Sequence, residues 1–237
     1  MALYSFDIND TITAFDSTDT SDLDARVNEI ISRSTEYKGY YSYYEYIKNK
    51  YPKDYKSICS KCTEEYQDLE HLRDKYWKIR EQIQCVLFPS FLKFLDRVDK
   101  VILRTFGSDG NLVIQEIQKY SSKFNNFIVG KMGHNGNEEY LEIEGKIIKD
   151  IENITEYLYN TENSVLIQED YRYWNSHKRR KEAGKLLYPS NFDQLFFDDN
   201  ECVDIIKNDD SKSITKYIRV NTAQAILDDD YYINFLI

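Results

Sequence analysis

Apolar residues follow two different patterns along this chain, and the change between them divides it into regions. Near the N-terminus, Leu3 to Phe6 form a short apolar and aromatic run that ends at Asp7 and a group of small polar residues. Such a run is typical of a buried parallel strand, and ligands of open α/β sheets bind at the carboxyl ends of their strands. The first dozen residues therefore predict a strand that delivers a carboxylate to a site.

The region from about Leu23 to Leu95 has apolar residues at helical spacing. Its longest example runs from Glu64 to Val86, where apolar residues recur every three or four positions with charged residues between them. We therefore expect a long helical region between the first strand and the second.

Beyond residue 96, short apolar runs alternate with further helical segments. We expect strands at 100–105, 127–129, 165–168, 194–197 and 217–220, helices at about 111–123 and 146–159, and a Gly-rich, mobile loop at 130–137. This alternation predicts an α/β fold with a doubly wound, mostly parallel sheet. The predicted domains are a core of residues 1–16 and 96–237, with Rossmann-like organisation, and a helical insertion of residues 17–95.

Composition narrows the class of protein. A chain of 237 residues, 41% of them hydrophobic, is long enough for one α/β domain with a substantial core. The formal net charge of −10 argues against a general nucleic-acid binder, which needs a basic surface. We find no apolar run of membrane-spanning length, no signal-peptide pattern, and four cysteines that do not form a disulfide framework. We therefore expect a cytoplasmic protein that binds neither membranes nor nucleic acids.

Polar side chains end three of the expected strands. The first strand ends in Asp7-Ile8-Asn9-Asp10-Thr11, the second in Thr105, and a later one in Asp198 and Asp199, with Lys185 shortly before it. In this order the residues resemble the four motifs of the haloacid dehalogenase (HAD) superfamily. Those motifs are a nucleophilic Asp, a Ser or Thr, a Lys or Arg, and an acidic pair.

The resemblance implies a phosphatase with a helical cap over its active site, the expected position of residues 17–95. Asp7 would be the nucleophile and would form an aspartyl-phosphate. Mg²⁺ would be held by Asp7, Asp198 or Asp199 and the backbone carbonyl of Asn9, because this ion prefers oxygen ligands.

The remaining roles implied by the resemblance concern the substrate. Thr11, Thr105 and Lys185 would bind the oxygens of the transferred phosphoryl group. The substrate would be a small phosphorylated molecule or a phosphoprotein. The pattern does not identify it, and it does not give the oligomeric state.

Asn9 departs from the phosphatase pattern. Most HAD phosphatases have Asp there, as the general acid that protonates the leaving oxygen, and an amide has no proton to give near neutral pH. Asp10 is one position further on and is the candidate substitute. Two alternatives therefore stay open: a HAD-fold module that binds a phospholigand or protein without turnover, and a metal-independent dehalogenase-type hydrolase.

Each motif also has a purely structural interpretation. The polar residues after the first strand fit an Asx turn, and the acidic pair fits a helix N-cap. Lys178 or Lys181 could replace Lys185. Cys59 and Cys62 have the spacing of zinc ligands, but the sequence offers no second pair at ligand spacing.

Overall fold

The computed structural model describes residues 2–14, 21–65, 72–83, 85–136, 138–205 and 213–237. Within these residues the chain forms an α/β fold around a sheet of eight strands in the order β10-β8-β1-β2-β6-β3-β4-β5. The strands are β1 (Leu3–Phe6), β2 (Ile102–Thr105), β3 (Phe127–Asn135), β4 (Glu138–Ile143), β5 (Lys146–Lys149), β6 (Ser164–Gln168), β8 (Gln194–Asp198) and β10 (Thr215–Arg219).

Strand β1 lies near the middle of the parallel part of the sheet. It pairs in parallel with β2 on one side and β8 on the other, and β10, β6 and β3 extend the parallel pairing outward. Among the described strands of this sheet, the antiparallel pairings are those of β4, with β3 on one side and β5 on the other. The predicted mostly parallel α/β sheet is therefore confirmed.

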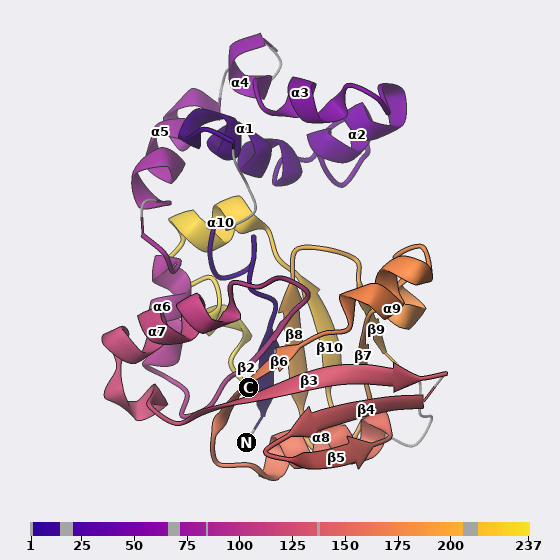
Figure 1. Ribbon diagram of the computed structural model, residues 1–237. Coiled ribbons are helices and arrows are strands. Elements are labelled where there is room, and N and C mark those ends of the chain that lie inside the picture. Colours follow the sequence, from indigo (N-terminus) through magenta and orange to yellow (C-terminus); the bar gives the residue numbers. More distant parts are fainter. Residues whose placement is uncertain (1, 15–20, 66–71, 84, 137, 206–212) are drawn as a thin grey trace.

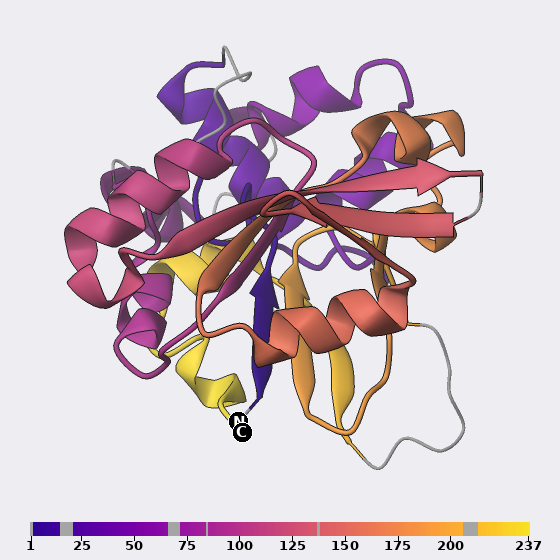
Figure 2. The same ribbon diagram turned by 60° about the horizontal axis from the view of Figure 1, so that its bottom comes forward.

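Helices cover both faces of the sheet (Figure 2). One face packs against α6 (Pro89–Leu95), α7 (Gly110–Tyr120) and α10 (Thr222–Leu227), and the other against α8 (Ile151–Asn160). Side chains alternate between the faces of a strand. Tyr4 and Phe6 accordingly belong to the first core cluster, and Leu3 belongs to the second.

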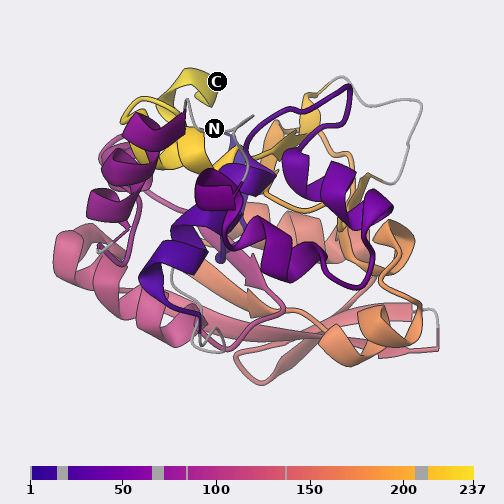
Figure 3. The ribbon, with the colours of Figure 1, turned by 90° about the horizontal axis from the view of Figure 1, so that it is seen from above.

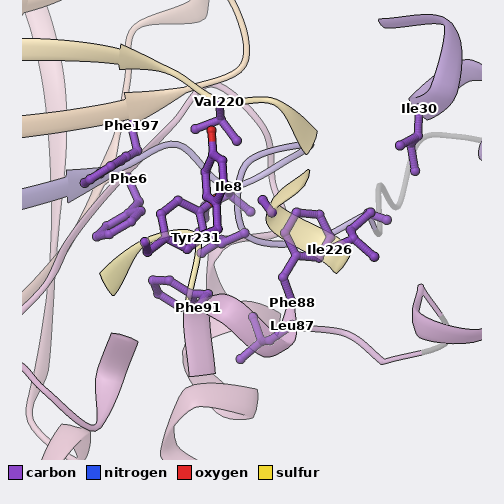
Figure 4. Packing of buried hydrophobic residues seen from close by; sticks show 14 of the residues in the cluster. Phe6, Ile8, Ile30, Leu87, Phe88, Phe91, Phe197, Val220, Ile226 and Tyr231 are labelled. Carbon is purple, nitrogen blue, oxygen red and sulfur yellow. The ribbon is translucent and has the colours of Figure 1, made fainter. Parts of the chain in front are cut away.

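Aromatic rings form the centre of the first cluster. Phe6 stacks on Phe197 of β8, with ring centroids 4.6 Å apart and planes at 11°, and meets Phe91 of α6 edge-on at 5.1 Å (Figure 4). All three rings are fully buried. Aromatic pairs contribute about 0.5–1.5 kcal/mol beyond the area they bury. They hold β1, and with it Asp7, firmly between its neighbours.

Five helices stand over the carboxyl ends of the parallel strands (Figures 1 and 3). They are α1 (Leu23–Arg33), α2 (Tyr43–Lys50), α3 (Tyr55–Cys59), α4 (Cys62–Glu65) and α5 (Arg73–Gln82). The first two begin at capping residues, where Asp22 accepts a hydrogen bond from the Ala25 amide at 2.7 Å and Ser42 from that of Glu45 at 3.2 Å. Helix α6 packs on the sheet face instead, so the helical unit over the edge comprises α1 to α5.

The expected loop at 130–137 is wrong, because β3 continues to Asn135 and forms a hairpin with β4. Two of its glycines lie against side chains of β4, and Gly136, with a φ of 65°, lies in the hairpin turn. A Cβ atom on Gly133 would lie 2.4 Å from Cζ of Tyr140, so a larger residue there would displace that ring.

The helix expected at 146–159 begins later in the structure than predicted. Residues 146–149 form β5, and α8 starts at Ile151. Glu144 and Gly145 both have positive φ, 50° and 72°, and form a tight turn that returns the chain as a strand.

A second, two-stranded sheet was not predicted. It pairs β7 (Lys185–Leu187) in parallel with β9 (Val203–Ile205), and helix α9 (Tyr171–Ser176) precedes it. Short 3-10 turns lie at Ser122–Phe124, Lys181–Ala183 (η3) and Ile233–Phe235. Among the described residues, no helix combines the length and apolar character needed to cross a membrane.

Candidate active site

Asp7 follows the last residue of β1, at the point where the strand order reverses between β2 and β8. Its backbone N–H donates to the Phe197 carbonyl at 2.8 Å, which continues the pairing with β8 beyond the strand end. The side chain is buried, at 11% exposure. Such reversal points are where open α/β sheets bind ligands, so the fold places a carboxylate at the expected position.

Lys185 joins this carboxylate to a second one. Its ammonium donates to Oδ1 of Asp7 and, at 2.7 Å, to Oδ2 of Asp198, and its side chain is only 1% exposed. Gly184 makes the approach possible, because a Cβ atom there would lie 2.0 Å from the Cys202 carbonyl oxygen. The Lys185 N–H donates to that same oxygen at 2.8 Å, which fixes β7 and directs the lysine inward.

The acidic pair ends β8. Asp198 is fully buried, and its Oδ1 accepts a hydrogen bond from the Asn200 amide at 2.8 Å. The Asp199 amide donates to the Thr11 hydroxyl oxygen at 3.1 Å. Asp7, Asp198 and Asp199 each offer a carboxylate oxygen within 4.8 Å of the others, and they are the one such group of possible metal ligands found among the described residues.

The electrostatics of the cluster reflect a shortage of positive charge. Burial raises the pKa of Asp7 to about 7, against the opposing attraction of Lys185, and Asp198 adds repulsion. Burial, together with repulsion by Asp10 and Asp198, raises the pKa of Asp199 well above its usual value. Burial lowers the pKa of Lys185, but the attraction of Asp198 and Asp7 outweighs it and raises that pKa well above its usual value. One lysine thus serves several carboxylates, and an added cation would stabilise their ionised forms.

Asn9 and Thr105 lie together on the other side of the β1 end. A Cβ atom on Gly107 would lie 3.5 Å from Oδ1 of Asn9 and 3.4 Å from Oγ1 of Thr105. The Thr105 hydroxyl oxygen accepts a hydrogen bond from the Gly107 amide at 2.9 Å. Nδ2 of Asn9 donates to Oδ2 of Asp109 at 3.3 Å. Asp109 is a site residue that sequence inspection missed, although it stands just before α7 in the turn after β2.

Asp10 faces a different group. Its carboxylate forms an ion pair with Arg26 of α1, and its φ of 60° turns the chain sharply after Asn9. The Thr11 hydroxyl oxygen is engaged with Asp199, as described above. The structure therefore brings Asp7, Lys185 and the acidic pair together, whereas Asp10 pairs with the helical unit.

The structure also places the alternative lysines, Lys178 and Lys181, and the cysteines with zinc-ligand spacing. Lys178 and Lys181 line a separate surface cavity, and it is Lys185 that reaches Asp7. Cys62 donates through its thiol to the Asn28 carbonyl at 3.3 Å, and burial raises the pKa of Cys62 to about 12. His71, the histidine nearest to these cysteines in the sequence, lies outside the described residues.

A cavity of about 190 Å³ opens beside Asp199, between the helical unit and the sheet. Two cation–aromatic pairs line it, with Cζ of Arg33 4.2 Å from the Tyr44 ring centroid and Cζ of Arg219 3.6 Å from that of Tyr41. Lys48, which is exposed, stands at its rim. The cavity thus adjoins the carboxylate cluster at Asp199 and is otherwise lined by both basic and acidic side chains, since Glu45 and Glu201 pair with Arg219 in its wall.

Comparison with protein-family models, with curated proteins and with solved structures finds no match to this chain.

Proposed function

We propose that this protein is a HAD-like, Mg²⁺-dependent phosphohydrolase in which Asp7 is the nucleophile. The observation that carries the proposal is the convergence of Asp7, Lys185 and Asp198 from three separate strands at the point where the strand order reverses. A buried carboxylate held against a lysine at such a point is suited to phosphoryl transfer, which relies on positioning and on neutralisation of charge.

The donor set fits Mg²⁺. This ion prefers oxygen ligands and needs one or two carboxylates, and Asp7, Asp198 and Asp199 offer oxygens within 4.8 Å of one another. When bound, the ion would draw electron density from the phosphoryl oxygens and offset their repulsion with Asp7. The carbonyl of Asn9 remains the further ligand implied by the HAD resemblance.

Asp7 would attack phosphorus through a carboxylate oxygen while the bond from phosphorus to the ester oxygen breaks. The leaving group takes that bonding pair and one proton, and departs as an alcohol. Water then attacks the aspartyl-phosphate and releases inorganic phosphate, which restores the carboxylate. Lys185 would shift its contact from Asp7 to the phosphoryl oxygens, with Thr105 and Thr11 as further donors.

Helices α1 to α5 would serve as the cap of this enzyme. Their position over the strand ends and the cavity beside Asp199 suit a lid that excludes water and contacts the leaving group. Substrate selection would then depend on the basic and aromatic side chains of that cavity, including Arg33, Tyr44 and Lys48. A small phosphorylated molecule or a phosphoprotein residue would both present an anion there, and we propose a cytoplasmic location for either.

Proton delivery is the step for which the motif is incomplete. The amide of Asn9 cannot donate a proton to the leaving oxygen, and Asp10 is engaged with Arg26. Asp109 places a carboxyl group against Asn9 and is the candidate donor. The Asn9 position also favours a second function, a phospholigand-binding module of the same fold without turnover. A metal-independent dehalogenase is the third possibility.

Phosphate release tests the proposal. Wild type, Asp7→Asn and the exposed control Asp99→Asn should be compared on a panel of phosphate esters, with Mg²⁺ and with a chelator. We expect Mg²⁺-dependent turnover in wild type and in the control, and none in Asp7→Asn. An active wild type that tolerates Asp7→Asn would exclude the mechanism. A folded wild type that binds phosphate and Mg²⁺ but hydrolyses nothing would favour the binding module, and halide release without metal would favour the dehalogenase.

A further inference from the structure

A basic surface lies between α9 and β7. Five consecutive residues, from His177 to Lys181, are basic in a chain whose formal net charge is −10. All five are exposed. Lys178 and Arg179 both adopt positive φ, 59° and 57°, so the backbone turns here and presents its side chains outward. Local charge on this surface is therefore opposite in sign to that of the molecule as a whole.

The charges of this surface are weakly neutralised. Lys181 lies 3.7 Å from Asp204, and its side chain is 56% exposed. Lys178 and Arg180 have no acidic partner among the residues that the structure describes. A pair as long and exposed as that of Lys181 contributes little. These cations thus remain available to an anion from outside.

The surface is also concave. A cavity of about 840 Å³ is lined by His177, Lys178, Arg180 and Lys181, together with the ring of Tyr173 and a single acid, Glu182. Cavities of this size accommodate extended ligands or parts of them. Four basic groups around one hollow favour a partner that carries several negative charges rather than one.

The surface adjoins the candidate active site. Lys181 precedes Lys185 by four residues, and four residues span at most about 14 Å. Trp174 of α9 stacks on Phe106, with centroids 4.4 Å apart, and the Phe106 ring lies 5.4 Å from Nζ of Lys185. A partner polypeptide that reaches Asp7 can therefore also reach the basic surface within a few of its residues.

The aromatic rings of α9 decide which polyanion fits. Single-stranded nucleic acids are held by bases that stack on open aromatic faces. Here Tyr173 stacks on His134 at 3.5 Å, and Trp174 is covered by Phe106 and Arg179. Tyr171 is the one exposed ring of this helix, and Arg179 donates to its hydroxyl at 2.9 Å. The surface thus offers many charges and a single exposed ring rather than a row of stacking platforms, and the net charge of −10 opposes a long phosphate backbone. Carboxylates spaced along a polypeptide suit it better.

We infer that the surface formed by residues 177–181 docks an acidic polypeptide segment. Its lysines and arginines pair with Asp and Glu side chains of the partner, and the cavity receives the partner chain. This inference does not rest on turnover at Asp7, because docking needs only the basic surface.

Fluorescence anisotropy with a labelled peptide of alternating Glu and Ser tests the inference on the full-length chain. The triple variant Lys178→Gln/Arg180→Gln/Lys181→Gln should bind at least about tenfold more weakly than wild type, a change of about 1.4 kcal/mol. The matched control Lys53→Gln/Lys56→Gln/Lys146→Gln removes the same charge from exposed positions elsewhere and should bind as wild type does. Wild-type affinity should fall as salt screens the charges.

Thermal unfolding confirms that each variant is folded before its affinity is compared. Equal binding by wild type and the folded triple variant overturns the inference, as does equal loss in the control. Tighter binding of a labelled oligo-dT strand than of the acidic peptide also overturns it, in favour of a nucleic-acid surface. Because no step is catalytic, loss of phosphatase activity in Asp7→Asn leaves the docking result unaffected.

Discussion

Arg26 of α1 forms an ion pair with Asp10, three residues after Asp7 in the turn that ends β1. Both side chains are largely buried, with exposures of 12% and 14%. Nε of Arg26 also donates to the Ala14 carbonyl at 3.1 Å. One side chain thus fixes the helical unit to the segment that carries the candidate nucleophile.

Loss of this link should be costly. Arg26→Ala leaves the Asp10 carboxylate without its cation in a largely buried setting, and removal of one partner from such a pair costs about 3 kcal/mol. The free energy of unfolding in urea should fall by that order. Arg80→Ala is the control, because its pair with Asp24 is far more exposed, at 34% and 52%, and should matter little. Equal effects of the two variants would show that Arg26 does not hold the helical unit in place.

Removal of Lys185 should affect both stability and turnover. Lys185→Met leaves Asp7 and Asp198 as neighbouring buried acids without a cation, so we expect a loss of about 3–5 kcal/mol in the free energy of unfolding. Mg²⁺ should recover part of that loss, because it supplies positive charge to the same carboxylates. Phosphate release should fall below detection even in folded protein. The exposed Lys53→Met serves as the control, and activity retained in Lys185→Met would remove the lysine from the proposed mechanism.

Asn9→Asp should raise turnover if a missing general acid limits the enzyme. Nδ2 of Asn9 lies 3.3 Å from Oδ2 of Asp109, so the new carboxyl would face a like group and hold a proton more tightly. General acids contribute about 10²–10⁴-fold, and esters with good leaving groups should gain least. Steady-state phosphate release with Mg²⁺ measures the gain.

The same assay on Asp109→Asn separates the two proton donors. We expect this variant to slow a wild type that relies on Asp109, most of all with poor leaving groups. If both variants are folded and neither changes turnover, protonation does not limit the reaction.

The hairpin formed by β3 and β4 should lose stability as the pH rises through the raised pKa of His134. Burial lowers the pKa of His134, but its hydrogen bonds to Glu139 and Asp170, both at 3.2 Å, outweigh burial and raise that pKa above its usual value. The contribution of protonated His134 to the free energy of unfolding is therefore complete below the unfolded-state pKa of about 6.5. It is lost as the pH rises through the raised pKa of His134 in the folded protein.

Unfolding in denaturant across this pH range measures the loss. The His134→Gln variant should lack the pH-dependent term, whereas His177→Gln, at an exposed position, should retain it. A wild type with the same pH profile as His134→Gln would contradict the assignment.

The site residues that the sequence could predict are those at the ends of strands. Apolar runs that stop at a carboxylate identified Asp7 and Asp198, because buried parallel strands need continuous apolar residues and their polar ends face the ligand edge. Asp109 carries no such signal, since it stands in a turn whose side chain becomes significant only beside Asn9. The partnership of Asp10 with Arg26 likewise depends on how the helical unit folds back.

Glycines explain the larger error in the fold. Gly130 and Gly133 were interpreted as loop residues because glycine is common in turns. In the structure they make room for the side chains of β4, with Tyr140 over Gly133. The three-residue strand β7 escaped prediction because it is too short to show a periodic pattern.

The central position of β1 also determines when the sheet can form during protein synthesis. Its partners in the sheet lie far along the chain, with Ser5 paired to Ile102 and Phe6 to Phe197. Strand β1 therefore cannot pair on one side until Ile102 has been made, or on the other side until Phe197 has been made. Pairings of such long separation form slowly and leave apolar strands open to aggregation meanwhile. The convergence of Asp7 and Asp198 on Lys185 is thus among the last contacts to form, and a nascent chain released before β8 would contain neither the complete sheet nor an assembled carboxylate cluster.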